Sequence, residues 1–297
     1  MEQCTYLSVT QLPDVARRVR HHILSMIHAS GAGHPGGSLS CVEILVTLYF
    51  REMRVSPTDP RWPDRDRFVL SKGHASATLY SVLAERGFFP VDELLTFDVI
   101  DSRLQGHVDM TKTPGVDMST GSLGQGLSAA CGMALGAKLG KQEFRVYCLL
   151  GDGESQEGQI WEAAMFAGNR ALDNLTAIVD YNKVQLCGPV AQVMPLEPYT
   201  DKWRSFGWSV VEVDGHDFEQ LISGFRRARE TRGAPTVLVA HTVKGKGVSF
   251  MEGQAKWHSR PIADDEFERA LEEIGLPQAR RAFGADLLTD GAGGGKR

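Results

Sequence analysis

The sequence predicts a three-layer α/β/α fold with a mainly parallel sheet. Two observations support this class: short, almost wholly apolar runs of strand length recur along the chain, and segments with a helical spacing of apolar residues separate them. A sheet exposed on one side would show alternating polar residues, so the apolar runs indicate a sheet that helices cover on both faces. With 297 residues, of which 42% are hydrophobic, the chain is large enough to bury such a core.

Two amphipathic helices are predicted near the N-terminus. Apolar residues recur at helical spacing over residues 15–26 and again over 41–53, on either side of a glycine-rich segment at 31–37. Strands are then expected at 68–70, 146–150, 176–179, 209–213 and 236–240. Such folds bind ligands where parallel strands end and helices begin, so motifs at those ends carry most of the functional information.

One domain is expected over residues 1–283. The sequence shows no internal repeat, and the remaining segment, 284–297, ends in Gly-Ala-Gly-Gly-Gly-Lys-Arg and has the composition of a disordered tail. We therefore expect the ordered part of the chain to stop just after this domain.

Composition and charge argue against several classes of protein. The formal net charge is -5 at pH 7 and the basic residues are spread along the chain, so neither nucleic acid nor a membrane is an expected partner. The N-terminus lacks the pattern of a signal peptide, and no stretch approaches the ~20 apolar residues of a membrane span. Five cysteines, far apart and never in a Cys-x-x-Cys pair, suggest neither disulfides nor a thiolate metal site. A cytoplasmic protein with a small-molecule ligand is expected.

A Gly-Asp-Gly turn followed thirty residues later by an asparagine is the most informative motif. Asp152 ends one predicted strand and Asn182 ends the next, so adjacent parallel strands would bring the carboxylate and the amide oxygen side by side. The carbonyl of Val184 lies just beyond. Three oxygens of this kind suit Mg²⁺, which fills its other positions with water and substrate phosphates. A diphosphate is the expected partner of the metal.

The same turn offers features that suit an anion. Gly151 and Gly153 would let the backbone approach a diphosphate closely, and a helix expected to begin near Ser155 would present its positive end. Gly-Asp-Gly alone is equally consistent with a tight turn between strand and helix. The asparagine at this spacing favours the metal site.

Four histidines, His34, His74, His107 and His258, lie in glycine-rich or turn-like segments. Each alone is more often a surface or hydrogen-bonded structural residue. Together they suggest a carbohydrate site, because neutral imidazoles bind hydroxyls and carbonyls and exchange protons near neutral pH.

The segment GDGESQEG resembles the metal and diphosphate signature of the transketolases, a family of thiamine diphosphate enzymes. Three further segments resemble this family in the family's order: SKGHASATLY, QGHVDM with STGSLGQG, and VKGKG with the downstream Trp257-His258. The likeness runs from about residue 14 to residue 275. It implies the thiamine diphosphate-binding fold, with thiamine diphosphate and Mg²⁺ as cofactors.

The resemblance also implies roles for single residues. His107 would bind the hydroxyl of the transferred two-carbon unit, His34 and His258 would handle protons of donor and acceptor, and His74 would lie beside the diphosphate. The metal ligands would be Asp152, Asn182 and the carbonyl of Val184. The cofactor-binding residues would be His74, Gly121, Ser122, Leu123, Gly153, Glu157, Asn182 and Lys244.

Several residues in these segments leave details open. Glu157 would hydrogen-bond towards a catalytic glutamate of a partner at the subunit interface. Lys72 and Lys244 would screen the charge of the diphosphate, or else be solvated surface lysines. Val108 and Ser259 replace the proline and glycine that are common after the corresponding histidines, so the sugar side of the site departs from the family's pattern.

Transketolases are usually more than twice this length, and their chemistry needs a glutamate from a pyrimidine-binding domain. The chain therefore resembles the N-terminal subunit of split, two-chain transketolases. It is expected to be active only with a C-terminal transketolase subunit, in an α2β2 heterotetramer acting on sugars or sugar phosphates.

The leading hypothesis is thus transfer of a two-carbon ketol unit from a ketose donor to an aldose acceptor. The alternative within the same chemistry is a related thiamine diphosphate enzyme that transfers an acyl unit from pyruvate, and His107 favours the first because pyruvate lacks the C1 hydroxyl. The 1-deoxyxylulose-phosphate synthases share the metal motif, but the STGSLGQG loop resembles transketolases. A non-catalytic protein that inherited the fold and a generic phosphate-binding α/β protein are the remaining alternatives.

Overall fold

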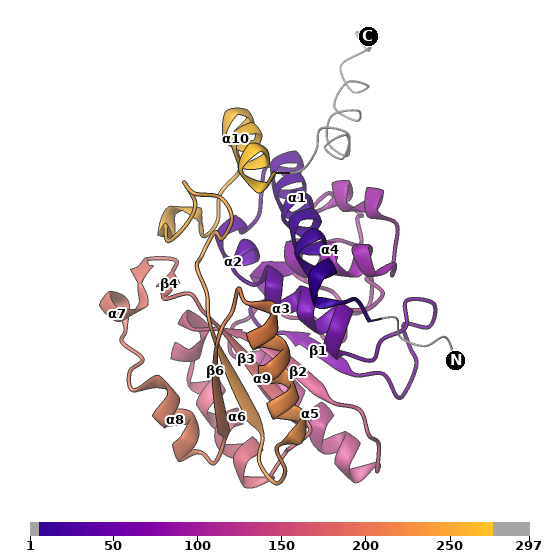
Figure 1. Cartoon of the computed structure of the whole chain (residues 1–297), viewed down its shortest axis with the longest axis vertical. Coiled ribbons are helices and arrows are strands. Elements are labelled where there is room, and N and C mark those ends of the chain that lie inside the picture. The colour runs from indigo at the N-terminus through magenta and orange to yellow at the C-terminus, as the bar shows by residue number, and fades with distance from the viewer. Residues whose placement is uncertain (1–5, 276–297) are drawn as a thin grey trace.

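A five-stranded parallel sheet lies at the centre of the computed structural model, which describes residues 6–275 (Figure 1). Its strands are, in spatial order, β1 (Arg67–Leu70), β2 (Val146–Gly151), β3 (Leu175–Tyr181), β7 (Thr236–His241) and β6 (Ser209–Asp214). All neighbouring pairs of this sheet are parallel, so the predicted parallel sheet and its strands are confirmed. A separate antiparallel pair is formed by β4 (Val184–Gln185) and β5 (Gly188–Pro189). The tail expected at 284–297 lies outside the described residues.

The central strands are apolar because both of their faces are covered. Every residue of β2 and of β3 is buried, whereas the edge strand β6 alternates buried and more exposed positions. Along β2, Tyr147 and Leu149 point into one hydrophobic core, while Cys148 and Leu150 point into the other. Successive side chains of a strand alternate between the faces of the sheet, so these two cores lie on opposite sides of it.

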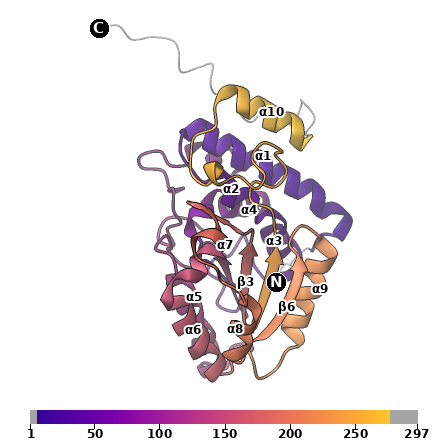
Figure 2. The ribbon, with the colours of Figure 1, turned by 90° about the vertical axis from the view of Figure 1, so that its left-hand side faces the viewer.

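Helices form the two outer layers. The larger core joins one face of the sheet with α1 (Leu12–Ser30), α3 (Val42–Thr47), α4 (Ser76–Arg86), α9 (Phe218–Glu230) and α10 (Asp264–Ile274), of which α10 lies against α1. The smaller core packs it against α5 (Gln125–Leu139), α6 (Gly158–Asn169) and α8 (Tyr199–Ser205), and two short helices, α2 (Pro35–Leu39) and α7 (Val190–Val193), lie in connections. Figure 2 shows α5 and α6 on one side of the strands and α9 on the other, which is the expected three-layer arrangement.

The N-terminal helices differ from the prediction at their ends. The helix predicted over 15–26 is confirmed as α1, which ends at Ser30 and is capped by Gly31 in the left-handed conformation (φ 67°), where glycine carries no steric penalty. The helix predicted over 41–53 is interrupted: α3 ends at Thr47 and a π-helical turn follows over Leu48–Glu52. The Glu52 carboxylate at the end of that turn is buried and accepts a hydrogen bond from the Tyr147 hydroxyl at 2.9 Å.

The turn after β2 also differs from the prediction. The expected helix start near Ser155 is wrong, because a 3₁₀ turn occupies Gly153–Gln156 and α6 begins only at Gly158. Ser155 stays in the 3₁₀ turn because its hydroxyl donates to the Gly151 carbonyl (3.0 Å) and hydrogen-bonds with the Tyr199 hydroxyl (2.8 Å). Within residues 6–275, no helix combines the length and the apolar character that a membrane span requires.

Candidate functional site

The carboxyl edge of the sheet brings together side chains from four strands. Lys72 follows β1, Asp152 follows β2, Asn182 follows β3, and Lys244 lies in the loop after β7. Because the strands are parallel, these ends meet at one edge. A cavity of about 240 Å³ opens there, and all four residues line it.

Most of the predicted site residues line this cavity: His74, Leu123, Asp152, Gly153, Glu157, Asn182, Val184, Lys244 and His258. The others lie next to it. The ring of His34 is 5.3 Å from that of His74 and 5.9 Å from that of His107. Gly121 packs against His107, since a Cβ at this glycine would lie 3.0 Å from the Cδ2 atom of the histidine. Ser122 is exposed in the same loop.

The three oxygens predicted as metal ligands lie on two adjacent loops. In the register of β2 and β3, Gly151 pairs with Asp180, so both strands end at the same level. One Asp152 oxygen accepts the backbone N–H of Gly153 at 2.7 Å, and the other accepts that of Lys183. The Val184 carbonyl accepts the Lys244 ammonium at 2.8 Å, which makes that ammonium the cationic partner of a predicted metal ligand.

The chemistry of this donor set fits a hard divalent cation. A carboxylate, an amide oxygen and a backbone carbonyl are the ligands that Mg²⁺ prefers. Burial and the neighbouring Asp180 carboxylate raise the pKa of Asp152 to about 6, so the negative charge here is under-compensated and a cation would stabilise it. Among the described residues no group of three or more His, Cys, Asp or Glu side chains could hold a metal ion, so a cation here would depend on the amide and carbonyl oxygens as well.

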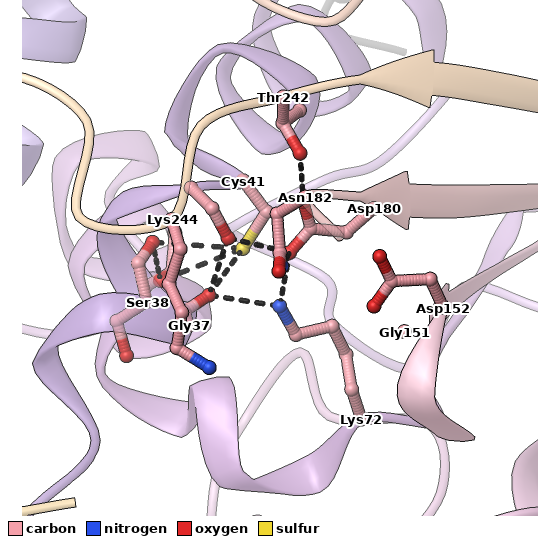
Figure 3. Close-up of polar contacts among 12 residues, drawn as sticks. Gly37, Ser38, Cys41, Lys72, Gly151, Asp152, Asp180, Asn182, Thr242 and Lys244 are labelled. Atoms are coloured by element: carbon pink, nitrogen blue, oxygen red, sulfur yellow. Dashed lines mark hydrogen bonds and ion pairs between the residues drawn. The ribbon is translucent and has the colours of Figure 1, made fainter. Parts of the chain in front are cut away.

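A buried ion pair between Lys72 and Asp180 lies beside these ligands (Figure 3). Lys72 is 1% exposed and Asp180 is 0% exposed. The Lys72 ammonium also donates to the Gly37 carbonyl at 2.8 Å. Lys244 is likewise buried, at 2% exposed. The alternative that Lys72 and Lys244 are solvated surface lysines is therefore wrong. Asp180 is not among the predicted site residues. Its presence in an otherwise largely apolar strand could have indicated a functional role.

The four predicted histidines converge. In addition to its contacts with His74 and His107, the His34 ring lies 5.6 Å from that of His258, and the His74 and His258 rings are 5.1 Å apart. Burial, followed by His107 and Lys244, lowers the pKa of His34 to about 4, and burial with the Lys244 charge lowers that of His258 to about 3. Burial and Lys72 also hold the pKa of His74 well below its usual value. These three imidazoles are neutral at neutral pH.

Glu154, which is also absent from the predicted site residues, ties the glycine-rich loop to the sheet. Its buried carboxylate accepts the N–H of Gly124 at 2.9 Å, the Ser71 hydroxyl at 2.5 Å and the N–H of Gly151 at 2.9 Å. Glu154 lies within the GDGESQEG motif, and this position could have indicated its role. Through Gly124, this carboxylate fixes the position of the Gly121–Leu123 segment beside the cavity.

Large apolar side chains are exposed at the rim of the cavity. Leu123 is 37% exposed and Leu186 60% exposed, and both line the opening. Met194, 55% exposed, is adjacent, because its carbonyl accepts the side-chain amide of Gln156 at 3.0 Å and Gln156 is itself a lining residue. Exposed apolar groups beside a polar cavity are typical of a surface that another chain covers.

Comparison with known proteins gives a consistent picture. Residues 13–289 match the family described as "Transketolase, thiamine diphosphate binding domain". The chain is 48% identical to the 6-deoxy-6-sulfo-D-fructose transketolase subunit SqwG of Clostridium sp. (strain MSTE9), over 87% of this chain and 94% of that one. It is 42% identical to an apulose-4-phosphate transketolase subunit of Phocaeicola vulgatus, over 90% and 95% of the two chains.

The solved structures agree on the fold. The transketolase of Campylobacter jejuni superposes with a TM-score of 0.85 at 30% identity. The superposition covers 96% of this chain and 48% of that one, so this chain spans about half the length of that enzyme.

Proposed function

Since the chain belongs to the transketolase family, we propose that it is the thiamine diphosphate-binding subunit of a two-chain transketolase, a transferase that moves a two-carbon ketol unit from a ketose to an aldose. The observation that carries this proposal is the meeting of the oxygen set of Asp152, Asn182 and Val184 with four histidines around one cavity. The match to nearly the whole length of two relatives named as transketolase subunits supports the two-chain form.

Mg²⁺ would be held by Asp152, Asn182 and the carbonyl of Val184. The diphosphate would lie against Gly153, His74 and the Lys244 ammonium, whose charge offsets that of the phosphates. The Gly121, Ser122 and Leu123 loop would contact the rest of the cofactor, with Glu157 at the rim facing the partner chain. When bound, thiamine diphosphate supplies the carbon nucleophile that attacks the ketose carbonyl.

Three of the histidines would bind the sugar. His107 would donate to the hydroxyl on the first carbon of the transferred unit. His34 and His258 would hold the carbonyl and hydroxyl groups between which protons move, and they suit this role because burial keeps both imidazoles neutral.

A partner chain would complete the site. It would cover the apolar rim formed by Leu123, Leu186 and Met194 and bring the pyrimidine-binding domain to the cofactor. We propose two copies of each chain, in an α2β2 assembly, with no turnover by this chain alone. The exposed fractions of the rim residues, between 37% and 60%, support a covered surface there.

The substrates would be ketoses and aldoses with an anionic group at the end remote from the reacting carbonyl. Two relatives are named for 6-deoxy-6-sulfo-D-fructose and apulose-4-phosphate, and both names include such a group. His34, His107 and His258 would handle only the reacting end, so the anionic end would be bound elsewhere, at least in part by the partner chain.

The test is reconstitution. The chain is mixed with the product of a neighbouring reading frame, and hydroxypyruvate decarboxylation is followed with and without thiamine diphosphate and Mg²⁺. Turnover that requires both chains and both cofactors supports the proposal. Activity with pyruvate but not hydroxypyruvate would replace it with acyl transfer, and turnover that does not depend on thiamine diphosphate would overturn it. A subsequent panel compares sulfonated, phosphorylated and unmodified ketoses.

A further inference from the structure

Asp180 is a carboxylate inside the fully buried strand β3, two residues before Asn182. Donor groups from four parts of the chain converge on it (Figure 3). One is the Lys72 ammonium after β1, and another is the Asn182 side-chain Nδ2, at 3.1 Å. The hydroxyls of Ser40 and Thr242 supply the others. An ionised carboxylate only accepts hydrogen bonds, so this arrangement satisfies every partner.

The contact between Asp180 and Asn182 decides which end of the Asn182 amide faces which way. An amide group has an oxygen and an –NH₂ of nearly equal size, and its two flipped orientations differ only in their hydrogen bonds. Asp180 accepts from the –NH₂, so the oxygen is directed the other way, where it accepts the backbone N–H of Val184 at 3.0 Å. The flipped orientation would set the amide oxygen against the carboxylate and turn the –NH₂ towards the cavity.

Lys72 makes it possible for this carboxylate to exist in the interior. An isolated ionised carboxylate in an apolar interior is very costly, and a buried pair persists only when its geometry is good and its remaining hydrogen bonds are satisfied. Here the second bond of the ammonium, to the Gly37 carbonyl at 2.8 Å, anchors it. The pair is neutral as a whole, so it orients Asn182 without adding net charge to the site.

We propose that Asp180, charge-balanced by Lys72, is a positioning residue that fixes the Asn182 side chain with its oxygen, not its –NH₂, towards the cation site. The inference rests on the proposed function, since it concerns the ligand set suggested for Mg²⁺. Hydrogen-bonded partners behind metal ligands commonly alter metal affinity by about 10–100-fold when they are removed.

Two double variants of the full chain isolate this role. Both replace Lys72 by Met, which removes the buried cation. In the amide variant, Lys72→Met with Asp180→Asn, the new side chain still offers an oxygen to the Asn182 –NH₂. In the leucine variant, Lys72→Met with Asp180→Leu, a side chain of similar size offers no acceptor. Neither variant leaves an uncompensated buried charge, so both avoid the main cost of breaking a buried pair.

The probe is Mn²⁺, which suits the same oxygen ligands, added with thiamine diphosphate. Loss of the free-ion signal in electron paramagnetic resonance measures its uptake. We expect the amide variant to bind Mn²⁺ within about 3-fold of the unmodified chain, and the leucine variant to bind about 10–100-fold more weakly. Thermal unfolding without metal is measured in parallel. Equal Mn²⁺ affinity in the two variants would overturn the inference and leave the proposed function standing, whereas no Mn²⁺ uptake by the unmodified chain would overturn both.

A second measurement needs no change at Asp180. The side-chain amide signal of Asn182 is identified by nuclear magnetic resonance as the signal that disappears in Asn182→Asp. If the leucine variant does not fold, this signal in the unmodified chain decides the matter. Protection of its –NH₂ from hydrogen exchange supports the bond to Asp180, and exchange at the rate of a solvated amide overturns the inference.

Discussion

The Nζ atom of Lys244 lies 2.8 Å from Nδ1 of His258. An ammonium has no acceptor, so the imidazole accepts this hydrogen bond and carries its own proton on Nε2. Burial, and then the charge of Lys72, lowers the pKa of Lys244 to about 8, which leaves it mostly protonated at neutral pH. The same ammonium donates to the Val184 carbonyl at 2.8 Å, so one cation links the predicted metal ligands to a predicted proton-handling histidine.

Asp152→Ala is expected to abolish Mg²⁺-dependent binding of thiamine diphosphate. It removes the ionised member of the proposed ligand set and leaves only neutral oxygens. Calorimetric titration with thiamine diphosphate and Mg²⁺ measures the effect, with Asp201→Ala, at a surface ion pair with Arg204, as the control. Unchanged affinity in Asp152→Ala would contradict the metal assignment.

His107→Ala is expected to reduce kcat/KM for donors with a C1 hydroxyl by about 10-fold or more, because one hydrogen bond to the substrate is lost. Cofactor affinity should change little. Steady-state kinetics of the reconstituted enzyme and cofactor titration are compared. His241→Ala, at a half-exposed histidine paired with Glu212, is the control. Parallel losses in cofactor affinity and in turnover would mean that His107 supports the structure instead.

Glu43→Gln is expected to destabilise the fold by about 3 kcal/mol at pH 7, because it leaves the buried Arg20 guanidinium without its carboxylate. Burial alone would raise the pKa of Glu43, but Arg20 and His216 together hold it below the usual value. The ionised carboxylate therefore contributes stability above its unfolded pKa of about 4.3, and this contribution is lost as the pH falls through the lower folded value. Denaturant unfolding should show the difference from the unmodified protein narrowing below pH 4. A constant difference would exclude the charge of Glu43 as its cause.

The two partners of Glu43, Arg20 and His216, also hold the loop that carries Lys244. Arg20 donates to the Lys246 carbonyl at 3.0 Å, and His216, bonded to Glu43, accepts the N–H of Val243 at 2.9 Å. Glu43→Gln should consequently weaken cofactor binding as well as stability, which calorimetry at pH 7 can check on the folded fraction.

Gly168→Ala is expected to destabilise the protein by about 1–3 kcal/mol, the range for overpacking. A Cβ there would lie 1.8 Å from the Phe206 carbonyl oxygen, which is backbone and cannot move independently. Gly132→Ala is a matched control, because it is also a helical glycine but has open space around it. It should gain about 0.5–1 kcal/mol. Equal effects in the two variants, measured by denaturant unfolding, would contradict the steric explanation.

The sheet could be predicted from the sequence because strands buried on both faces appear as short apolar runs, which can be recognised without knowing the rest of the fold. The strand before Asp152 is apolar, the strand before Asn182 is apolar over most of its length, and their short separation along the chain favours neighbouring positions. Each of these signals lies within a single βαβ unit. The adjacency of the two strands in the sheet agrees with that expectation.

The Lys72–Asp180 pair could not be predicted in the same way. Its partners are 108 residues apart in sequence, and their contact depends on β1 and β3 lying on either side of β2. Lys72 also looks like a surface lysine when only its neighbours in sequence are considered. The 3₁₀ turn at Gly153–Gln156 escaped prediction for a similar reason, because the Tyr199 hydroxyl that bonds Ser155 comes from a distant helix.

The cavity at the carboxyl edge of the sheet draws its lining from the ends of β1, β2, β3 and the loop after β7. During synthesis, Lys72 leaves the ribosome long before Lys244 and His258, and the sheet cannot close around the cavity until β7 inserts between β3 and β6. Such long-range pairing is slow to form. We therefore expect competence to take up the cofactor to be acquired late in folding, and a chain truncated before β7 to carry the Gly-Asp-Gly motif without a complete cavity around it.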